Sequence, residues 1–248
     1  MNLSDRARQI ASLVDLTSLS GMETREEMAQ LCARASGPWG HVAALCVFAP
    51  WVPFVRDCLD RAGLSSVPVA TVVNFPAGEA PISAVAEEIR SAVAAGAAEI
   101  DLVFPYTAFM QGHTAAVRDF MRVCRENCPV PLKVILETGV LADDVVIRNA
   151  CRLAMDAGAD FLKTSTGKAA VHATPGAAKV MLEAIAEQEG KTGFKASGGL
   201  RTMDDALTYL CLAEQLLGPD WVRPQKFRFG ASGLLDDVLQ HVTMEEVR

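Results

Sequence analysis

Residues 157–163, Ala-Gly-Ala-Asp-Phe-Leu-Lys, join the end of a helix to a strand, and the chain contains a near copy of this join. The copy is residues 95–101, Ala-Gly-Ala-Ala-Glu-Ile-Asp. In each, the glycine suits the left-handed conformation that often ends a helix. The apolar residues that follow predict a buried parallel strand. The sequence therefore repeats a unit in which a helix leads into a strand.

Eight short apolar runs, each followed by a small-residue loop and a helical segment, extend this pattern along the chain. The helical segments carry start and stop signals: a capping box at residues 24–27, an N-cap and proline at residues 174–175, and helical periodicity over residues 80–95. The runs lie roughly at residues 12–17, 42–48, 67–74, 98–104, 131–137, 160–165, 193–197 and 226–231.

Eight strand–helix units in 248 residues are typical of a (β/α)8 TIM barrel. We therefore predict an α/β protein whose residues 1–248 form a single barrel domain with a short N-terminal helix. An open doubly wound sheet is the alternative. That fold usually has a glycine-rich turn after its first strand, whereas residues 17–21 here read Thr-Ser-Leu-Ser-Gly.

Composition and charge narrow the classes of function. Half of the residues are hydrophobic and the net charge is -7, which argues against nucleic-acid and membrane partners. The longest apolar stretch, residues 42–55, is too short to span a bilayer, and the polar N-terminus lacks the features of a signal peptide. Seven cysteines without ligand-like spacing indicate reduced thiols. We expect a cytoplasmic protein.

Polar side chains gather where the apolar runs end, and in a barrel these ends share the face on which active sites are built. Each position alone has an ordinary explanation, because joins between strands and loops are often polar. Their collective placement favours an active site. The residues are Asp15, Thr17, Cys46, Asn74, Asp101, Glu137, Thr138, Lys163, Lys195 and Ser232.

Two lysines, Lys163 and Lys195, end the sixth and seventh runs. A buried lysine is costly unless its amine is paired or neutral, and a nearby cation and desolvation both lower its pKa. A neutral lysine attacks carbonyl groups and forms a Schiff base, for which Asp101 and Lys195 would move protons. The alternative is that both lysines and Asp101 form structural salt bridges. Lys133 lies near the start of its run, so we expect a structural role at the far end of the barrel.

Three small loops suit a phosphate, because glycine lets backbone N–H groups approach an anion closely. They are residues 166–168, 197–201 and 230–233, and the last two follow the strands after which barrels commonly bind phosphate. Ordinary tight turns are the alternative. Cys46 is either a lining residue of the site or a buried structural thiol. The scattered histidines, with His172 in a surface loop, predict no metal site.

At these residues the sequence resembles the deoxyribose-phosphate aldolases, a class I family. The most specific pair is Lys-Thr-Ser-Thr-Gly at 163–167 and Phe-Lys-Ala-Ser-Gly-Gly at 194–199. Matching segments run in order from residue 14 to 232. They are residues 14–17, 44–47, 70–76, 99–106, 132–138, 160–167, 193–199 and 227–232.

The resemblance implies a TIM barrel that reversibly cleaves 2-deoxy-D-ribose 5-phosphate to acetaldehyde and D-glyceraldehyde 3-phosphate, in deoxyribonucleotide catabolism, without a cofactor. It implies that Lys163 forms the Schiff base and that Lys195 and Asp101 assist as proton carriers. Asp15 and Thr17 match residues near the substrate hydroxyls. The other expected substrate-binding residues are Cys46, Thr166, Gly167, Lys168, Gly198, Gly199, Arg201, Gly230 and Ser232.

Two positions depart from the family pattern. Gly233 stands where a serine is common, and the chain ends at Arg248 without the terminal tyrosine of some members. Gly233 leaves room for an aldolase that acts on another sugar phosphate or on a 2-keto acid. A pyridoxal-phosphate enzyme, which also joins a lysine to a phosphate site, and a non-catalytic sugar-phosphate binder stay open as well. Apolar positions such as Trp51 and Phe54 are expected on the surface, where they would form a contact in a homodimer or larger homo-oligomer.

Overall fold

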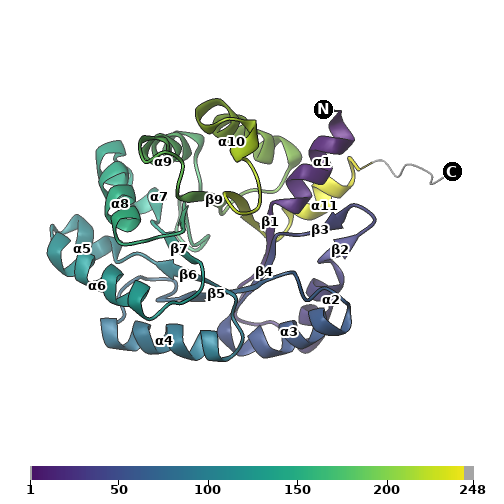
Figure 1. Cartoon of the computed structure of the whole chain (residues 1–248), viewed down its shortest axis with the longest axis horizontal. Helices are drawn as coiled ribbons and strands as arrows, with labels where there is room; N and C mark the ends of the chain where they lie inside the picture. The colour runs from purple at the N-terminus through teal and green to yellow at the C-terminus, as the bar shows by residue number, and fades with distance from the viewer. Residues whose placement is uncertain (1, 243–248) are drawn as a thin grey trace.

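The computed structural model describes residues 2–242, and a closed barrel of eight parallel strands forms its centre (Figure 1). The N-terminal strand of the barrel pairs with its second strand on one side and with its last strand on the other, so no edge is left open. The strands, in their order around the barrel, are β1 (Val14–Ser18), β4 (Ala44–Val47), β5 (Val69–Val73), β6 (Glu99–Val103), β7 (Leu132–Ile135), β8 (Phe161–Lys163), β9 (Gly193–Ser197) and β10 (Phe227–Ala231).

Helices surround the barrel and alternate with its strands, which confirms the predicted TIM barrel and excludes the open sheet. Two short strands, β2 (Ser36–Gly37) and β3 (Gly40–His41), pair antiparallel outside it. The helices are α1 (Leu3–Ser12), α2 (Arg25–Ala33), α3 (Val52–Arg61), α4 (Ile82–Ala94), α5 (Tyr106–Met110), α6 (Thr114–Glu126), α7 (Thr138–Leu141), α8 (Asp144–Asp156), α9 (Pro175–Glu187), α10 (Met203–Leu217) and α11 (Leu234–Leu239), with short 3-10 turns at Ala49–Trp51 and Pro219–Trp221.

The helix signals in the sequence have the expected structural counterparts. Thr24 caps α2 through a capping box with Glu27, and Thr174 caps α9. Gly96 and Gly158, the glycines of the two repeated joins, have φ of 101° and 91°. A positive φ is easy for glycine and costly for residues with a Cβ, which explains why glycine ends both helices. The predicted short N-terminal helix is α1, which packs beside α11 (Figure 1).

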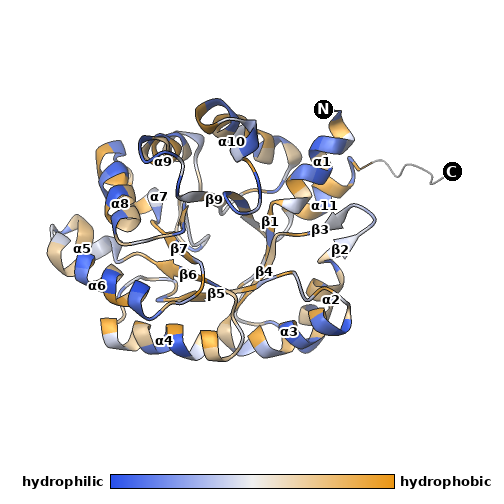
Figure 2. Cartoon of the chain, viewed as in Figure 1, coloured by the Kyte–Doolittle hydropathy of each residue, from blue (hydrophilic) through white to orange (hydrophobic). Residues whose placement is uncertain are grey.

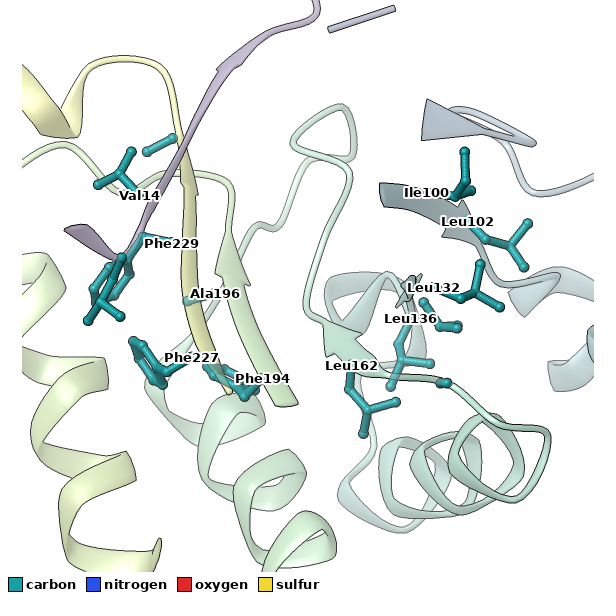
Figure 3. Close-up of a cluster of buried hydrophobic side chains, with 14 of the residues drawn as sticks. Val14, Ile100, Leu102, Leu132, Leu136, Leu162, Phe194, Ala196, Phe227 and Phe229 are labelled. Carbon is teal, nitrogen blue, oxygen red and sulfur yellow. The ribbon is translucent and has the colours of Figure 1, made fainter. Parts of the chain in front are cut away.

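Alternation along the strands divides apolar from charged side chains. Successive strand residues point to opposite faces, so Phe194 and Ala196 point toward the helices while Lys195 between them points into the barrel. In β10, Phe227 and Phe229 flank Arg228 in the same way. Figure 3 shows the outward side chains of β9 and β10 packed together, with the rings of Phe227 and Phe229 4.9 Å apart. The same pattern turns the charged residues of β6, β7 and β8 inward.

The apolar core therefore lies between the strands and the helices (Figure 2). The helices present apolar residues to the barrel and polar residues outward, as amphipathic surface helices do. Within residues 2–242, no helix has the length and hydrophobicity required to cross a bilayer. The inside of the barrel holds the charged side chains that form the candidate site, together with a small apolar group of Cys46, Ala70 and Val72.

Candidate active site

Seven buried ionisable side chains meet inside the barrel, and we call them the barrel charge cluster. None of the seven residues is more than 6% exposed. A charge buried away from water is tolerated only when it is paired and hydrogen-bonded. The cluster consists of Asp15, Glu99, Asp101, Lys133, Lys163, Lys195 and Arg228.

Asp101 is the centre of the cluster, because its carboxylate accepts hydrogen bonds from three lysines. Its Oδ2 atom lies 2.8 Å from Lys163 Nζ and 2.7 Å from Lys195 Nζ. Its Oδ1 atom lies 2.8 Å from Lys133 Nζ. Strands β8 and β9 are neighbours, with Lys163 paired to Lys195 in register. The strand topology thus brings together the two lysines and the carboxylate that the sequence singled out.

Asp15 closes the other side of the cluster. Its Oδ2 atom lies 2.5 Å from Lys195 Nζ, and its Oδ1 atom lies 2.5 Å from Arg228 Nη1. Arg228 also reaches Glu99, at 3.1 Å. Lys195 is therefore held by two carboxylates, whereas Lys163 has the single carboxylate oxygen that it shares with Lys195.

The expected position of Lys133 at the far end of the barrel is wrong. Its ammonium lies 2.6 Å from Glu99 and 2.8 Å from Asp101, inside the same cluster as Lys163. Strands in a barrel are tilted and staggered, so a residue near the start of one strand lies level with the middle of another. Here Lys133 pairs in register with Asp101, and its position along its own strand does not report its height in the barrel.

The charges of the cluster and their contacts indicate which side chain most readily loses its proton. Three carboxylates face four cationic side chains, so the fully ionised cluster carries one excess positive charge. Deprotonation of one lysine makes the cluster neutral, and a buried environment favours neutrality. Lys163 has the fewest carboxylate contacts of the four cations, so its amine is the one expected to become neutral.

The pKa directions follow the same pattern. Burial, reinforced by the nearby Lys195 charge, lowers the pKa of Lys163 even though Asp101 opposes this. Burial acts in the same direction on Lys195, but Asp101 and Asp15 outweigh it and raise the pKa of Lys195. The pKa of Asp101 lies well below its ordinary value, because three lysine charges outweigh the effect of burial. The site thus combines a carboxylate, an ammonium group and a lysine biased toward its neutral form.

A cavity of about 550 Å³ opens beside the cluster at the carboxyl ends of the strands. Thr17 and Ser197 line it and lie two residues beyond Asp15 and Lys195 on the same strands, so the cavity adjoins the cluster. Lys163 itself is 2% exposed and lies behind the lining. The lining residues are Thr17, Ser18, Leu19, Ser20, Thr166, Gly167, Lys168, His172, Ser197, Gly198, Gly199, Leu200, Arg201, Gly230, Ala231 and Ser232.

The three small-residue loops predicted from the sequence all contribute to this cavity. Among the hydrogen bonds of residues 2–242, none uses the backbone N–H of Gly167, Gly198 or Gly199. Lys168 is exposed and donates a hydrogen bond to the Leu19 carbonyl at 2.7 Å, which links the loop after β8 to the loop after β1. Unused amides beside a lysine are the groups that bind a phosphate.

The start of α10 is less available to an anion than its position suggests. The N–H groups of Arg201 and Thr202 both donate to the Asp205 carboxylate at 2.9 Å, within the capping box of that helix. The amides of the preceding glycines are therefore the better anion donors in this loop.

Comparison with known proteins identifies the family. Residues 9–231 match the model of the DeoC/LacD family of aldolases. This chain belongs to the DeoC/LacD aldolase family. Its fold is shared by a Toxoplasma gondii ME49 protein provisionally named a deoxyribose-phosphate aldolase, with 27% identity, a TM-score of 0.86, and coverage of 97% of this chain and 96% of that one.

Two further structures extend the comparison. A Coccidioides immitis protein with the same provisional name is 31% identical, has a TM-score of 0.81, and matches over 94% of this chain and 86% of its own. The tetrameric deoxyribose phosphate aldolase of Aeropyrum pernix is 24% identical with a TM-score of 0.75, and the match covers 96% of this chain and 95% of that one. The last likeness supports the fold alone.

Two other residues singled out from the sequence, Cys46 and Asn74, do not line this cavity. Cys46 is buried, and burial and the Asp101 charge raise the pKa of its thiol, so it stays neutral and is a weak nucleophile. Asn74 is occupied structurally: its side chain donates to the Val103 carbonyl and accepts from the Ala80 amide, both at 2.9 Å. Within residues 2–242, no three His, Cys, Asp or Glu side chains form a group arranged to hold a metal ion.

His172 is a cavity residue that the sequence analysis placed in a surface loop. It is half-buried, lines the cavity, and lies against Gly198, where an added Cβ would be 3.1 Å from the imidazole Nδ1. No spacing rule indicates this, because the contact joins the loop after β8 to the loop after β9. Ser18, Leu19 and Ser20, which follow the predicted Thr17, were also missed as lining residues. Leu200 and Ala231 lie within the predicted loops 197–201 and 230–233 but were not singled out.

Proposed function

We propose that this aldolase reversibly cleaves 2-deoxy-D-ribose 5-phosphate to acetaldehyde and D-glyceraldehyde 3-phosphate through a Schiff base on Lys163. The observation that carries the proposal is the position of a buried lysine of lowered pKa beside a cavity with unused backbone amides. The names of the similar Toxoplasma gondii and Coccidioides immitis proteins support the same substrate.

The chemistry begins at the C1 aldehyde of the open-chain sugar. The neutral Lys163 amine attacks C1, and the carbinolamine loses water to give a protonated imine. A base then removes the proton of the C3 hydroxyl. The C2–C3 bond breaks, C3 becomes the aldehyde of glyceraldehyde 3-phosphate, and the bonding electrons pass to C2 to form an enamine. Protonation at C2 and hydrolysis release acetaldehyde and free Lys163. The protonated imine is the electron sink.

Asp101 and Lys195 are the groups proposed to move the protons. Asp101 is ionised because its pKa is lowered, so it can accept a proton. Lys195 is an ammonium because its pKa is raised, so it can donate one. Both contact each other at 2.7 Å, and Asp101 contacts Lys163 through the same oxygen. A proton can therefore pass between the reacting carbon and the cluster by short steps.

The phosphate of the substrate is proposed to occupy the three loops that line the cavity. The N–H groups of Gly167, Gly198 and Gly199 supply donors, and Lys168 and Arg201 supply positive charge at the mouth. Thr17 is proposed to lie near the sugar hydroxyls, with Asp15 beneath it. Gly233 has no side chain to offer, and no atom lies within 4 Å of an added Cβ there, so the serine common in the family would fit.

A cleavage assay with purified protein tests the substrate. We expect turnover of deoxyribose 5-phosphate without added cofactor, and Lys163→Met is expected to lower it by about a thousandfold or more, since covalent catalysis is lost. Preferential turnover of the aldol product of a 2-keto acid would indicate a different aldolase. A visible absorption band of bound pyridoxal phosphate, or binding of the sugar phosphate without any turnover, would also contradict the proposal.

The compartment and assembly of the enzyme stay predictions. All seven cysteines are free, which supports the proposed location in a reducing cytoplasm. The expectation that Trp51 and Phe54 are exposed is wrong, because both are half-buried and pack edge-to-face at 6.0 Å. Arg25 covers Phe54 at 4.4 Å. A homo-oligomer remains our proposal, and light scattering on the purified protein tests it. The chain end without a tyrosine lies outside the described residues.

A further inference from the structure

Glu137 is a buried carboxylate that takes no part in the barrel charge cluster. It lies directly beyond β7, is 1% exposed, and has a left-handed backbone with φ 55° and ψ 58°. A left-handed conformation is uncommon for a residue with a Cβ and costs on the order of 1 kcal/mol. Burial of a carboxylate adds a second cost. Glu137 therefore combines an unfavourable backbone conformation with a buried carboxylate, and such combinations often occur at functional sites.

The contacts of Glu137 lead to the cavity. Its Oε2 atom accepts a hydrogen bond from the Thr166 amide at 3.1 Å and from the Thr166 hydroxyl at 2.5 Å. The same hydroxyl oxygen accepts the Lys168 N–H at 3.0 Å. The carboxylate therefore orients Thr166, and Thr166 in turn orients the backbone of Lys168. Gly167, whose amide is unused, lies between these two fixed points.

The residues after Glu137 hold the rest of the same loop. The Thr138 amide donates to the Thr164 carbonyl at 2.9 Å. An added Cβ on Gly139 would lie 2.1 Å from the Val171 carbonyl oxygen, so the two backbones are in direct contact. Residues 137–139 thus contact the loop after β8 near its beginning, its middle and its end. These contacts hold the loop after β8 in one conformation.

Only one oxygen of the Glu137 carboxylate takes part in the contacts with Thr166. Oε1 is buried and has no hydrogen-bond partner among residues 2–242, while Oε2 accepts both bonds from Thr166. An unpartnered buried oxygen costs about 1–3 kcal/mol, so barrel stability does not explain the residue. A glutamine has the same shape and retains an acceptor oxygen, which makes Glu137→Gln a conservative control.

We infer that Glu137 is a positioning residue that fixes Thr166 and Lys168 so that the loop presents its amides to the substrate phosphate. The inference rests on the proposed function, in which this loop binds the phosphate. It assigns Glu137 no contact with substrate. Loss of its carboxylate should therefore weaken recognition of the phosphate and leave imine formation at Lys163 largely intact.

The test compares substrates with and without the phosphate. In Glu137→Ala, we expect KM for deoxyribose 5-phosphate to rise by about tenfold or more, in line with the loss of a positioned hydrogen-bond donor set. KM for unphosphorylated 2-deoxyribose and the trapping of acetaldehyde with borohydride should stay within about threefold, because neither uses the phosphate. Glu137→Gln should restore most of the affinity. An equal rise in KM for both substrates would overturn the inference.

A double-mutant cycle tests the route through Thr166. Calorimetry with glycerol 3-phosphate measures binding without turnover. Glu137→Ala and Thr166→Val should each weaken binding, and the double variant should bind no worse than the weaker single variant, since both remove one interaction. If the losses of affinity in the two single variants multiplied in the double variant, Glu137 would not act through Thr166. The wild type and the three variants could show these relative affinities for glycerol 3-phosphate while the wild type does not cleave deoxyribose 5-phosphate. In that case the positioning role stands and the proposed function fails. Absence of glycerol 3-phosphate binding to the wild type overturns the role.

Discussion

Three lysines share the carboxylate of Asp101, yet their other surroundings shift their pKa values in different directions. Lys133 and Lys195 each contact a second carboxylate, and their pKa values are raised. Lys163 has no second carboxylate, and burial lowers its pKa. The number of carboxylate contacts therefore distinguishes Lys163, the proposed nucleophile, from Lys133 and Lys195, whose ammonium forms are favoured.

Removal of the Lys195 charge should move the pH dependence of imine formation. The Lys195 charge lowers the pKa of Lys163, so Lys195→Leu should raise that pKa and leave Lys163 protonated beside Asp101. Attack needs the neutral amine, whose fraction increases as pH rises through the pKa. We therefore expect slow imine formation at neutral pH and partial rescue at higher pH. The measurement is the rate of acetaldehyde trapping as a function of pH.

Lys179 offers a control for this experiment, since its side chain is 60% exposed on α9. Lys179→Met should leave the pH profile unchanged. A Lys195→Leu profile that fell in amplitude without moving along the pH axis would contradict the electrostatic role of Lys195.

Replacement of Lys163 itself should cost no stability. Lys163→Met removes the excess charge of the cluster and leaves three cations facing three carboxylates. Removal of one partner from a buried ion pair is costly when it leaves a charge uncompensated, but Asp101 keeps its two other lysine partners. Lys133→Met is the matched comparison. It takes the nearest cation from Glu99, which keeps only Arg228 at 3.1 Å, and one of three lysines from Asp101. We therefore expect a loss of about 3–5 kcal/mol. Urea unfolding measures both. Equal destabilisation by the two variants would contradict the importance of the carboxylate contacts that Lys133 makes and Lys163 lacks.

At the scale of elements, a glycine in strand β10 leaves space for the buried side chain of Lys195. Gly230 of β10 faces Lys195, and an added Cβ would lie 2.9 Å from Lys195 Cε and 2.8 Å from Ser197 Oγ. Neither contact is acceptable in a packed interior. The glycine is therefore required by space, in a strand where a β-branched residue would otherwise favour the conformation.

Gly230→Ala should displace the Lys195 side chain and lower the rate of imine formation by about 10- to 100-fold, since a shift of about 1 Å is costly in a preorganised site. Gly176 in the first turn of α9 is the control, because no atom lies within 4 Å of an added Cβ there. Gly176→Ala should leave the rate unchanged. An unchanged rate in Gly230→Ala would show that Lys195 tolerates displacement.

The sequence predicts the strands and longer helices well, because alternation, caps and glycine joins are local signals. It does not reveal α5 and α7, which have five and four residues. Helices this short form through contacts with the rest of the protein. The contact of Glu137 with Thr166 is hidden for the same reason: it joins two loops on neighbouring strands. Lys133 was misplaced because barrel stagger cannot be read along one strand.

At the scale of the whole molecule, the barrel charge cluster links stability to pH. The pKa values of Asp15 and Asp101 are lowered from an ordinary 3.8, since surrounding cations outweigh burial. A carboxyl group with a lowered folded pKa contributes stability that is present above its unfolded pKa and is lost as pH falls toward the folded pKa. We therefore expect the free energy of unfolding to fall steeply below about pH 4.

Urea unfolding at stepwise pH measures this dependence. Asp101→Asn should be less stable at neutral pH, because three lysines lose the carboxylate that they share, and should show a shallower decline in acid. A wild-type stability that is flat between pH 4 and pH 2 would contradict the assigned ionisation of the cluster.

The barrel, the two adjacent lysines and the three loops follow from sequence alone, because each depends on strand order and local patterns. The substrate came from family resemblance, since neither charge nor periodicity specifies a sugar. The lowered pKa of Lys163 is visible only in the structure, because it depends on burial and on charged side chains of β6 and β9.

The most direct test of the central claim is chemical trapping of the Schiff base. The purified protein is incubated with acetaldehyde, reduced with borohydride, digested and mapped by mass spectrometry. The account predicts one ethyl adduct, on Lys163, and none on the adjacent Lys195 or Lys133, whose raised pKa values keep them protonated. An adduct on either of those lysines in place of Lys163, or no adduct at all, would contradict the account.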